Sequence, residues 1–214
     1  MKNLNENSSA QGIFLSGGAS TRMGVPKQWL PFANTPLFLY TYDRLRTVCQ
    51  DVVIVTNDHA EQLRYRDLGL RTTADLYPHQ GPLAGLHAGL QGLEPDAAAV
   101  LLGCDLPFLR ADVLRDLLDA LEENPELDAV VPCDGEHVYP VCAVYRARVR
   151  EVAEVCLARG DNAMRRFLQK LRVHNIPTER WSALTPDPFF NMNTPEEYRI
   201  ACTLWKREGL PHHD

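Results

Sequence analysis

The sequence of 214 residues has no long hydrophobic run. Its longest apolar stretch, residues 97–103, is much shorter than the roughly 20 residues that a membrane-spanning helix requires. Basic residues are not in excess either: 22 lysines and arginines stand against 28 aspartates and glutamates, and the formal net charge is −6. Because non-specific nucleic-acid binding requires a basic face, we expect neither a membrane nor a nucleic-acid partner. A local cluster of bases would still suffice for a small anionic ligand.

Cysteine pairs with metal-binding spacing are also missing. The six cysteines form no C-x-x-C motif, and the histidines have no spacing typical of a metal site. Residues 1–10 are polar and lack the apolar core of a signal peptide. These absences predict a cytoplasmic protein with reduced thiols.

The length and composition are typical of one globular domain. Hydrophobic residues make up 45% and charged residues 23% of the chain, which excludes a collagen-like, coiled-coil or disordered protein. We expect a flexible N-terminal tail at residues 1–10, a single domain at residues 11–207 and a C-terminal tail at residues 208–214.

Short apolar runs alternate with helical patterns along the chain. The runs are predicted strands at residues 12–16, 52–56, 98–104 and 129–131. The helical patterns lie at residues 36–49, 60–68, 81–92, 111–123, 148–159 and 194–206. Residues 138–145 are predicted as a further strand outside this alternation, an antiparallel candidate. Buried strands separated by helices predict an α/β fold of three layers with a mostly parallel central sheet.

In such a sheet, ligands bind beyond the carboxyl ends of the strands, so the loops after Ser16, Thr56 and Cys104 should share one crevice. The first of these loops, within residues 15–27, is rich in small residues. Its glycines would let backbone amides approach a phosphate, and its cations, Arg22 and Lys27, would neutralise phosphate charge. The segment fits neither a Walker A loop nor the G-x-G-x-x-G motif. The alternative interpretation is a glycine-rich turn with solvated cations.

Asp105 directly follows a predicted buried strand and is therefore aimed at the same crevice. A single carboxylate there can bind Mg²⁺, which usually keeps several waters and also binds substrate phosphates. The alternative is an ordinary helix cap or loop carboxylate. Because the glycine-rich first loop is expected at the same crevice, we favour the Mg²⁺-binding role for Asp105.

Four segments, at residues 15–27, 81–86, 104–107 and 191–196, occur in an order that resembles the molybdenum cofactor guanylyltransferases of the MobA family. The resemblance runs from about residue 12 to residue 206. It implies a three-layer αβα nucleotidyltransferase fold, Rossmann-like, with a mixed but mostly parallel sheet. It also implies Mg²⁺-dependent transfer of GMP from GTP to molybdopterin, by in-line attack of the terminal phosphate of the pterin on the α-phosphorus, with release of pyrophosphate. Transient contacts with other cofactor-synthesis proteins or molybdoenzyme chaperones would fit this role.

The resemblance also implies site residues. Lys27, Asp105 and Arg22 would be catalytic, and Asp105 would bind the metal. The nucleotide would be bound by Leu15, Ser16, Gly17, Gly18, Lys27, Asn57, Asp75, Gly81 and Asp105. The acceptor side would include Tyr139, Arg165, Asn191 and Asn193. Several of these residues have a structural alternative: Asn57 and Asp75 as cap or loop residues, Arg165 on a solvated helix face, and the asparagine pair in a turn before the final helix.

Two other functions remain open from the sequence. The first is cytidylyl transfer to molybdopterin or another phosphate acceptor, because the string Pro26-Lys27-Gln28 resembles that of the cytidylyltransferases of isoprenoid synthesis. The segment at residues 81–86 favours the guanylyl branch. The second function is that of a non-catalytic carrier of molybdopterin or nucleotide, which would not need both Lys27 and Asp105.

Overall fold

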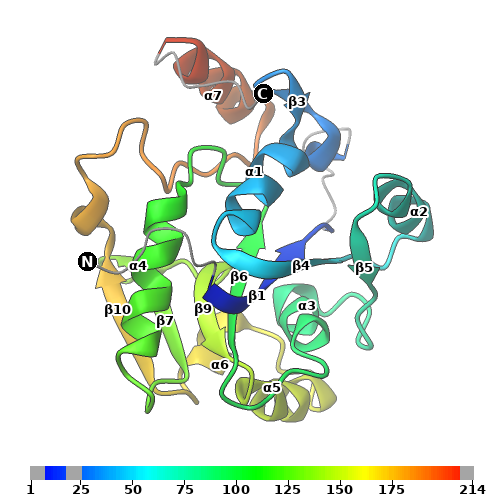
Figure 1. Ribbon diagram of the computed structural model, residues 1–214, viewed down its shortest axis with the longest axis vertical. Helices are drawn as coiled ribbons and strands as arrows, with labels where there is room; N and C mark the ends of the chain where they lie inside the picture. Colours follow the sequence, from blue (N-terminus) through cyan, green and yellow to red (C-terminus); the bar gives the residue numbers. More distant parts are fainter. Residues whose placement is uncertain (1–7, 18–25, 208–214) are drawn as a thin grey trace.

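The computed structural model describes residues 8–17 and 26–207, and its centre is a mixed β-sheet (Figure 1). Along the sheet the strand order is β10-β7-β9-β6-β1-β4-β5, with β8 paired to β7. The strands of this sheet are β1 (Ser8–Leu15), β4 (Cys49–Val55), β5 (Arg71–Thr73), β6 (Ala98–Gly103), β7 (Ala129–Asp134), β8 (His137–Val138), β9 (Cys142–Arg146) and β10 (Val173–Pro177).

Most strand pairs are parallel, and β9 is the exception at the centre. β1 lies parallel to β4 and β6, β4 to β5, and β7 to β10. β9 runs antiparallel to both β6 and β7. The prediction of a mixed, mostly parallel sheet with one antiparallel strand in the region 138–145 is therefore confirmed, although residues 139–141 separate β8 from β9.

Helices cover both faces of the sheet (Figure 1). The helices are α1 (Leu37–Arg46), α2 (His59–Asp67), α3 (Gly81–Gly89), α4 (Ala111–Glu122), α5 (Val149–Ala158), α6 (Met164–Leu168) and α7 (Pro195–Arg207), with 3-10 turns η1 (Lys27–Trp29) and η2 (Thr178–Trp181). One core cluster joins α1 and α4 to one face, and a second joins α3, α5 and α6 to the other. This is the predicted three-layer arrangement.

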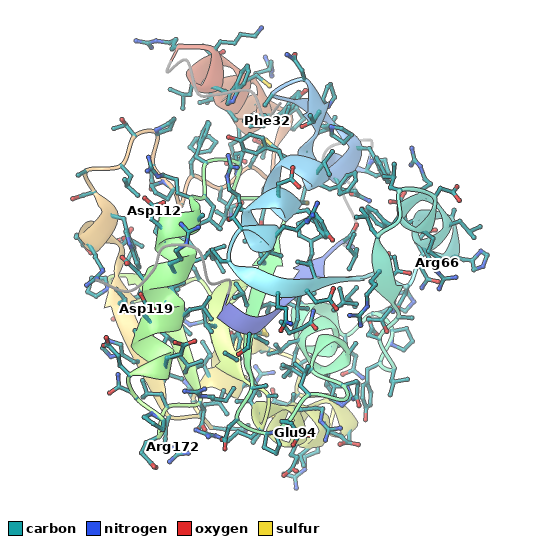
Figure 2. The ribbon with its side chains drawn as sticks, in the orientation of Figure 1. Phe32, Arg66, Glu94, Asp112, Asp119 and Arg172 are labelled. Carbon is teal, nitrogen blue, oxygen red and sulfur yellow. The ribbon has the colours of Figure 1, made fainter. Side chains whose placement is uncertain are left out.

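A small third cluster joins α7 to the hairpin of β2 (Pro31–Phe32) and β3 (Thr35–Pro36). Phe32 lies near α7 in this cluster, at the opposite end of the molecule from Arg172 (Figure 2). The hairpin has no sequence signal, because its turn uses Ala33 and Asn34, both with positive φ, in place of the glycine such turns favour.

Several predicted boundaries are corrected. The first helix ends at Arg46 and not at residue 49, because Cys49 already begins β4. The helix predicted at 81–92 ends at Gly89. β1 begins at Ser8, inside the predicted N-terminal tail, and Ala10 is buried in the core. The short strands β5 and β10 and the five-residue α6 were not predicted, since none has a long apolar pattern.

The glycines of α3 allow this helix to lie directly on β1. A Cβ atom on Gly85 would lie 2.5 Å from Leu15 Cδ2, and one on Gly89 would lie 2.5 Å from Ile13 Cγ2. Close packing against the sheet therefore accounts for glycine at both positions. No helix among residues 8–17 and 26–207 is long and apolar enough to cross a membrane.

Candidate active site

The carboxyl ends of three neighbouring strands meet at one edge of the sheet. Leu15, the last residue of β1, is in register with Val55 of β4 on one side and Gly103 of β6 on the other. The amide of Ser16 then donates to the carbonyl of Val55 at 3.0 Å. The loops after β1, β4 and β6 therefore begin side by side, as the sequence predicted.

Lys27 and Asp105, which are far apart in the sequence, lie together at this edge. Lys27 Nζ is 3.8 Å from Asp105 Oδ2, and it donates to Asn193 Oδ1 at 3.3 Å. Their side chains are partly accessible, at 21% for Lys27 and 29% for Asp105. The amide of Met192 donates to the carbonyl of Asp105 at 2.9 Å, so the segment before α7 is anchored on the loop after β6. The fold thus brings three predicted site residues together around one cation–carboxylate pair.

The surroundings of Asp105 fit a Mg²⁺ ion that is also held by substrate. A Cβ atom on Gly103 would lie 2.9 Å from Asp105 Oδ1, so the glycine provides the room in which this carboxylate lies. Among the described residues, no group of three or more histidine, cysteine or acidic side chains is arranged to hold a metal. One carboxylate with waters and phosphate oxygens is, however, the ligand set in which Mg²⁺ is commonly bound.

Asn57 and Asp75 pair with each other beyond β4 and β5. Asn57 Nδ2 donates to Asp75 Oδ2 at 2.8 Å, and the amide of Asp75 donates to Asn57 Oδ1 at the same distance. The alternative of Asn57 as a helix cap is wrong, because Asp58 caps α2 through the amides of Ala60 and Glu61. The pair holds the chain between β5 and α3 at the same edge of the sheet.

Gly81 begins α3 with a φ of +69°, a backbone conformation that other residues adopt at a cost. The preceding residue, Gln80, makes no side-chain hydrogen bond to the first turn. The first amides of α3 are therefore not capped by that side chain, and the N-terminal end of the helix suits an anionic or carbonyl-bearing ligand.

A cavity of about 190 Å³ adjoins Asp105 on the side of β8 and β9. Tyr139 and Asn191, two predicted acceptor-side residues, line it together with Asp105. His137 also lines it, with its ring centroid 4.7 Å from that of Tyr139. Burial raises the pKa of the Tyr139 phenol.

The other predicted residues fall into two groups. Arg165 is exposed and donates to the carbonyl of Glu136 at 3.0 Å, beside β8 but not among the residues lining the cavity. Gly18 and Arg22 lie outside the described residues.

A larger cavity of about 620 Å³ between α4 and β10 contains none of the predicted site residues.

The turn before α7 also caps this helix, which is the structural alternative given above for Asn191 and Asn193. The amides of Asn193 and Thr194 donate to Glu197 Oε2 at 2.7 and 2.8 Å, and the amide of Glu197 donates to Thr194 Oγ1. These hydrogen bonds, with that from Asn193 first, lower the pKa of the Glu197 carboxyl. Asn193 therefore belongs both to this cap, through its backbone, and to the Lys27 contact, through its side chain.

Comparisons with known proteins agree with this geometry. A family model described as a MobA-like NTP transferase domain matches residues 12–176. A molybdenum cofactor guanylyltransferase of Desulfosudis oleivorans is 35% identical over 193 residues, covering 89% of this chain and 93% of that protein. One of Yersinia pestis is 32% identical over 202 residues, covering 92% and 96%.

The fold has a solved counterpart as well. The crystal structure of molybdopterin-guanine dinucleotide biosynthesis protein A from Archaeoglobus fulgidus matches with a TM-score of 0.80 and 23% identity, covering 92% of this chain and 99% of that one. Together with the family match and the relatives, this confirms the resemblance carried by the four ordered segments. The chain belongs to the MobA-like NTP transferase domain family and is a nucleotidyltransferase.

Proposed function

We propose that this protein transfers GMP from GTP to molybdopterin, giving the guanine dinucleotide form of the cofactor and pyrophosphate. The observation that carries the proposal is the Lys27–Asp105 pair at the carboxyl ends of the central strands, next to a cavity lined by Asp105 and Tyr139. The names of relatives at 30–35% identity support the choice of both substrates.

In this reaction an oxygen of the acceptor phosphate forms a bond to the α-phosphorus of GTP, and the bond to the bridging oxygen of pyrophosphate breaks. The protein supplies positioning and charge, and no covalent intermediate on a side chain is needed. The backbone of Leu15, Ser16, Gly17 and Gly18 holds the nucleotide phosphates. Lys27 and Arg22 offset their negative charge.

Asp105 would hold Mg²⁺, which stabilises the charge on the α-phosphate and on the departing pyrophosphate when it is bound. Asn57, Asp75 and Gly81 hold the nucleoside end of GTP. Tyr139, Asn191 and Asn193, with Arg165 farther out, form the acceptor side. Removal of one preorganised electrostatic contact of this kind typically costs about 10²–10³ in rate.

One observation bears on the cytidylyl alternative. Gln28, which carries the likeness to the cytidylyltransferases, is buried, and its Nε2 donates to Glu61 Oε2 at 3.3 Å. This side chain packs between η1 and α2, so the likeness has a packing explanation. A cytoplasmic location and contact with other cofactor-synthesis proteins are also part of the proposal. The six cysteines are all free, which supports a reducing compartment.

Titration calorimetry with GTP and CTP in the presence of Mg²⁺ tests the base preference. GTP is expected to bind more tightly, and a preference for CTP would overturn the guanylyl assignment. Turnover with molybdopterin, measured as pyrophosphate release, tests the reaction. We expect Asp105→Ala to lower the rate by about 10²–10³ while the protein stays folded. Nucleotide binding without turnover by the unmodified protein would favour a carrier.

A further inference from the structure

The residues that follow Lys27 are tied to helix α2 through one buried carboxylate. Glu61 is 8% exposed, and its Oε2 accepts hydrogen bonds from Trp29 Nε1 at 2.6 Å and from Gln28 Nε2 at 3.3 Å. Its other oxygen, Oε1, lies 3.3 Å from Arg64 Nη1. Both oxygens are therefore used, and two of the three partners are the residues directly after Lys27.

The partly buried Trp29 ring packs against helices α1 and α2. It stacks on Tyr65 of α2 with ring centroids 5.3 Å apart, and it forms a T-shaped pair with Phe38 of α1 with ring centroids 4.7 Å apart. The Arg64 guanidinium lies 4.0 Å from the ring centroid. Such packing leaves η1 little freedom to shift relative to α2.

The beginning of the phosphate loop is tied to the same helix. The Ser16 hydroxyl, which directly follows β1, forms a hydrogen bond of 2.6 Å with the Tyr65 hydroxyl. Burial raises the pKa of Tyr65, so the phenol remains protonated at neutral pH. α2 thus holds Ser16 through Tyr65, and it holds the residues next to Lys27 through Glu61.

We propose that Glu61 is a positioning residue for nucleotidyl transfer, which acts by fixing the backbone of η1 and thereby the Lys27 ammonium group at the reacting phosphates. The inference rests on the proposed function of Lys27 and deepens it. In the proposed reaction the backbone of the first loop contributes to binding the nucleotide, whereas the exact place of the Lys27 ammonium group matters most in the transition state. Loss of the anchor should therefore lower kcat more than it raises KM for GTP.

Two variants loosen the anchor in different ways. Glu61→Gln keeps the size of the side chain but replaces one acceptor oxygen by an amide group, and Trp29→Phe keeps an aromatic ring while removing the donor. Asp67→Asn is the matched control, since it makes the same carboxylate-to-amide change at an exposed position of the same helix. We expect kcat to fall by roughly 10-fold in Glu61→Gln and Trp29→Phe. KM should change less than about threefold, and Asp67→Asn should behave as the unmodified protein.

A double-mutant cycle separates positioning from general support of the fold. In a Lys27→Ala background, Glu61→Gln should have almost no further effect on kcat/KM, because the group that it positions is gone. A merely structural role predicts the same fold-loss in both backgrounds, and that result would overturn the proposal. Unchanged kcat in both single variants would overturn it as well.

A second measurement does not depend on the substrates. Amide hydrogen exchange should be faster across residues 27–37 in Glu61→Gln and Trp29→Phe, since the amides of Trp29 and Leu30 donate to the nearby carbonyls of Pro26 and Lys27 and the side-chain anchor holds this turn in place. Unchanged exchange there would overturn the anchor itself. If the unmodified protein does not turn over GTP and molybdopterin, the proposed function fails, and the exchange result alone decides whether the anchor exists.

Discussion

The close contact between α3 and β1 makes a quantitative prediction for two glycines of the same helix. By helix propensity alone, replacing either Gly85 or Gly89 by alanine should stabilise the protein by up to about 1 kcal/mol. The structure predicts otherwise, because the added Cβ atoms meet side chains of the central strand. The two sites differ in what they meet, and this difference is the test.

At Gly89, a Cβ atom would lie 2.5, 2.7 and 2.7 Å from three atoms of the buried Ile13 side chain. A β-branched side chain in the middle of a sheet has no free rotamer to adopt, so overpacking should cost about 1–3 kcal/mol. Because the gain in helix propensity offsets part of this overpacking cost, we expect Gly89→Ala to lower the free energy of unfolding by about 1–2 kcal/mol. For a chain of this length that is a fall in Tm of about 2–8 °C.

At Gly85, a Cβ atom would be closer than 3.4 Å only to Leu15 Cδ2, the far end of a flexible side chain. Leu15 can rotate away, so Gly85→Ala should change stability by less than about 1 kcal/mol. Because Leu15 ends β1 beside the proposed phosphate site, the shift should instead weaken nucleotide binding. Thermal unfolding of both variants checks the ranking, and a Gly89→Ala protein more stable than the unmodified one would refute the packing argument.

Two further predictions concern other contacts. Burial alone would raise the pKa of Asp128, but hydrogen bonds from Arg172 and Arg148 outweigh it and lower the pKa to about 2. The ionised carboxylate therefore stabilises the folded protein at pH values above the ordinary pKa of an aspartate. This stabilisation is lost as the pH falls toward 2. Asp128→Asn should therefore cost about 1–2 kcal/mol at pH 7 and progressively less in urea unfolding series down to pH 3; a pH-independent difference would contradict this. Thr194→Ala, which removes the cap of α7, should cost about 1 kcal/mol in the same assay, and Thr194→Ser should restore most of it. Equal stability of the alanine and serine variants would argue against the cap.

Part of the fold could be predicted from the sequence because local patterns carry it. Strands β1, β4 and β6 are buried on both faces by helices, so their sequences must be continuous apolar runs, and these are visible without a structure. The N-terminal end of α7 was equally readable, since Thr194 and Glu197 cap it through contacts only three residues apart. The place of Asp105 at a strand end followed from the same pattern.

The remaining elements were invisible for a physical reason. β5 and β10 are the two edges of the sheet, where one side of the strand has no partner strand and polar residues are tolerated. β10, with exposed His174 and Asn175, has no alternation that would distinguish it from a loop. The antiparallel strand β9 was expected, but its place between β6 and β7 depends on pairing over long sequence distances, which no local pattern encodes.

The chemistry of the site divides in the same way. From the sequence came the residue types: a glycine-rich loop with Lys27, a strand-end aspartate and an asparagine pair. Only the tertiary structure decided that Lys27 meets Asp105 and Asn193, the latter 166 residues away, and that Glu61 anchors the residues beside Lys27. Strand order determines which loops become neighbours, and strand order is a property of the packed sheet as a whole. A buried carboxylate such as Glu61 has no signature until the side chains that surround it are in place.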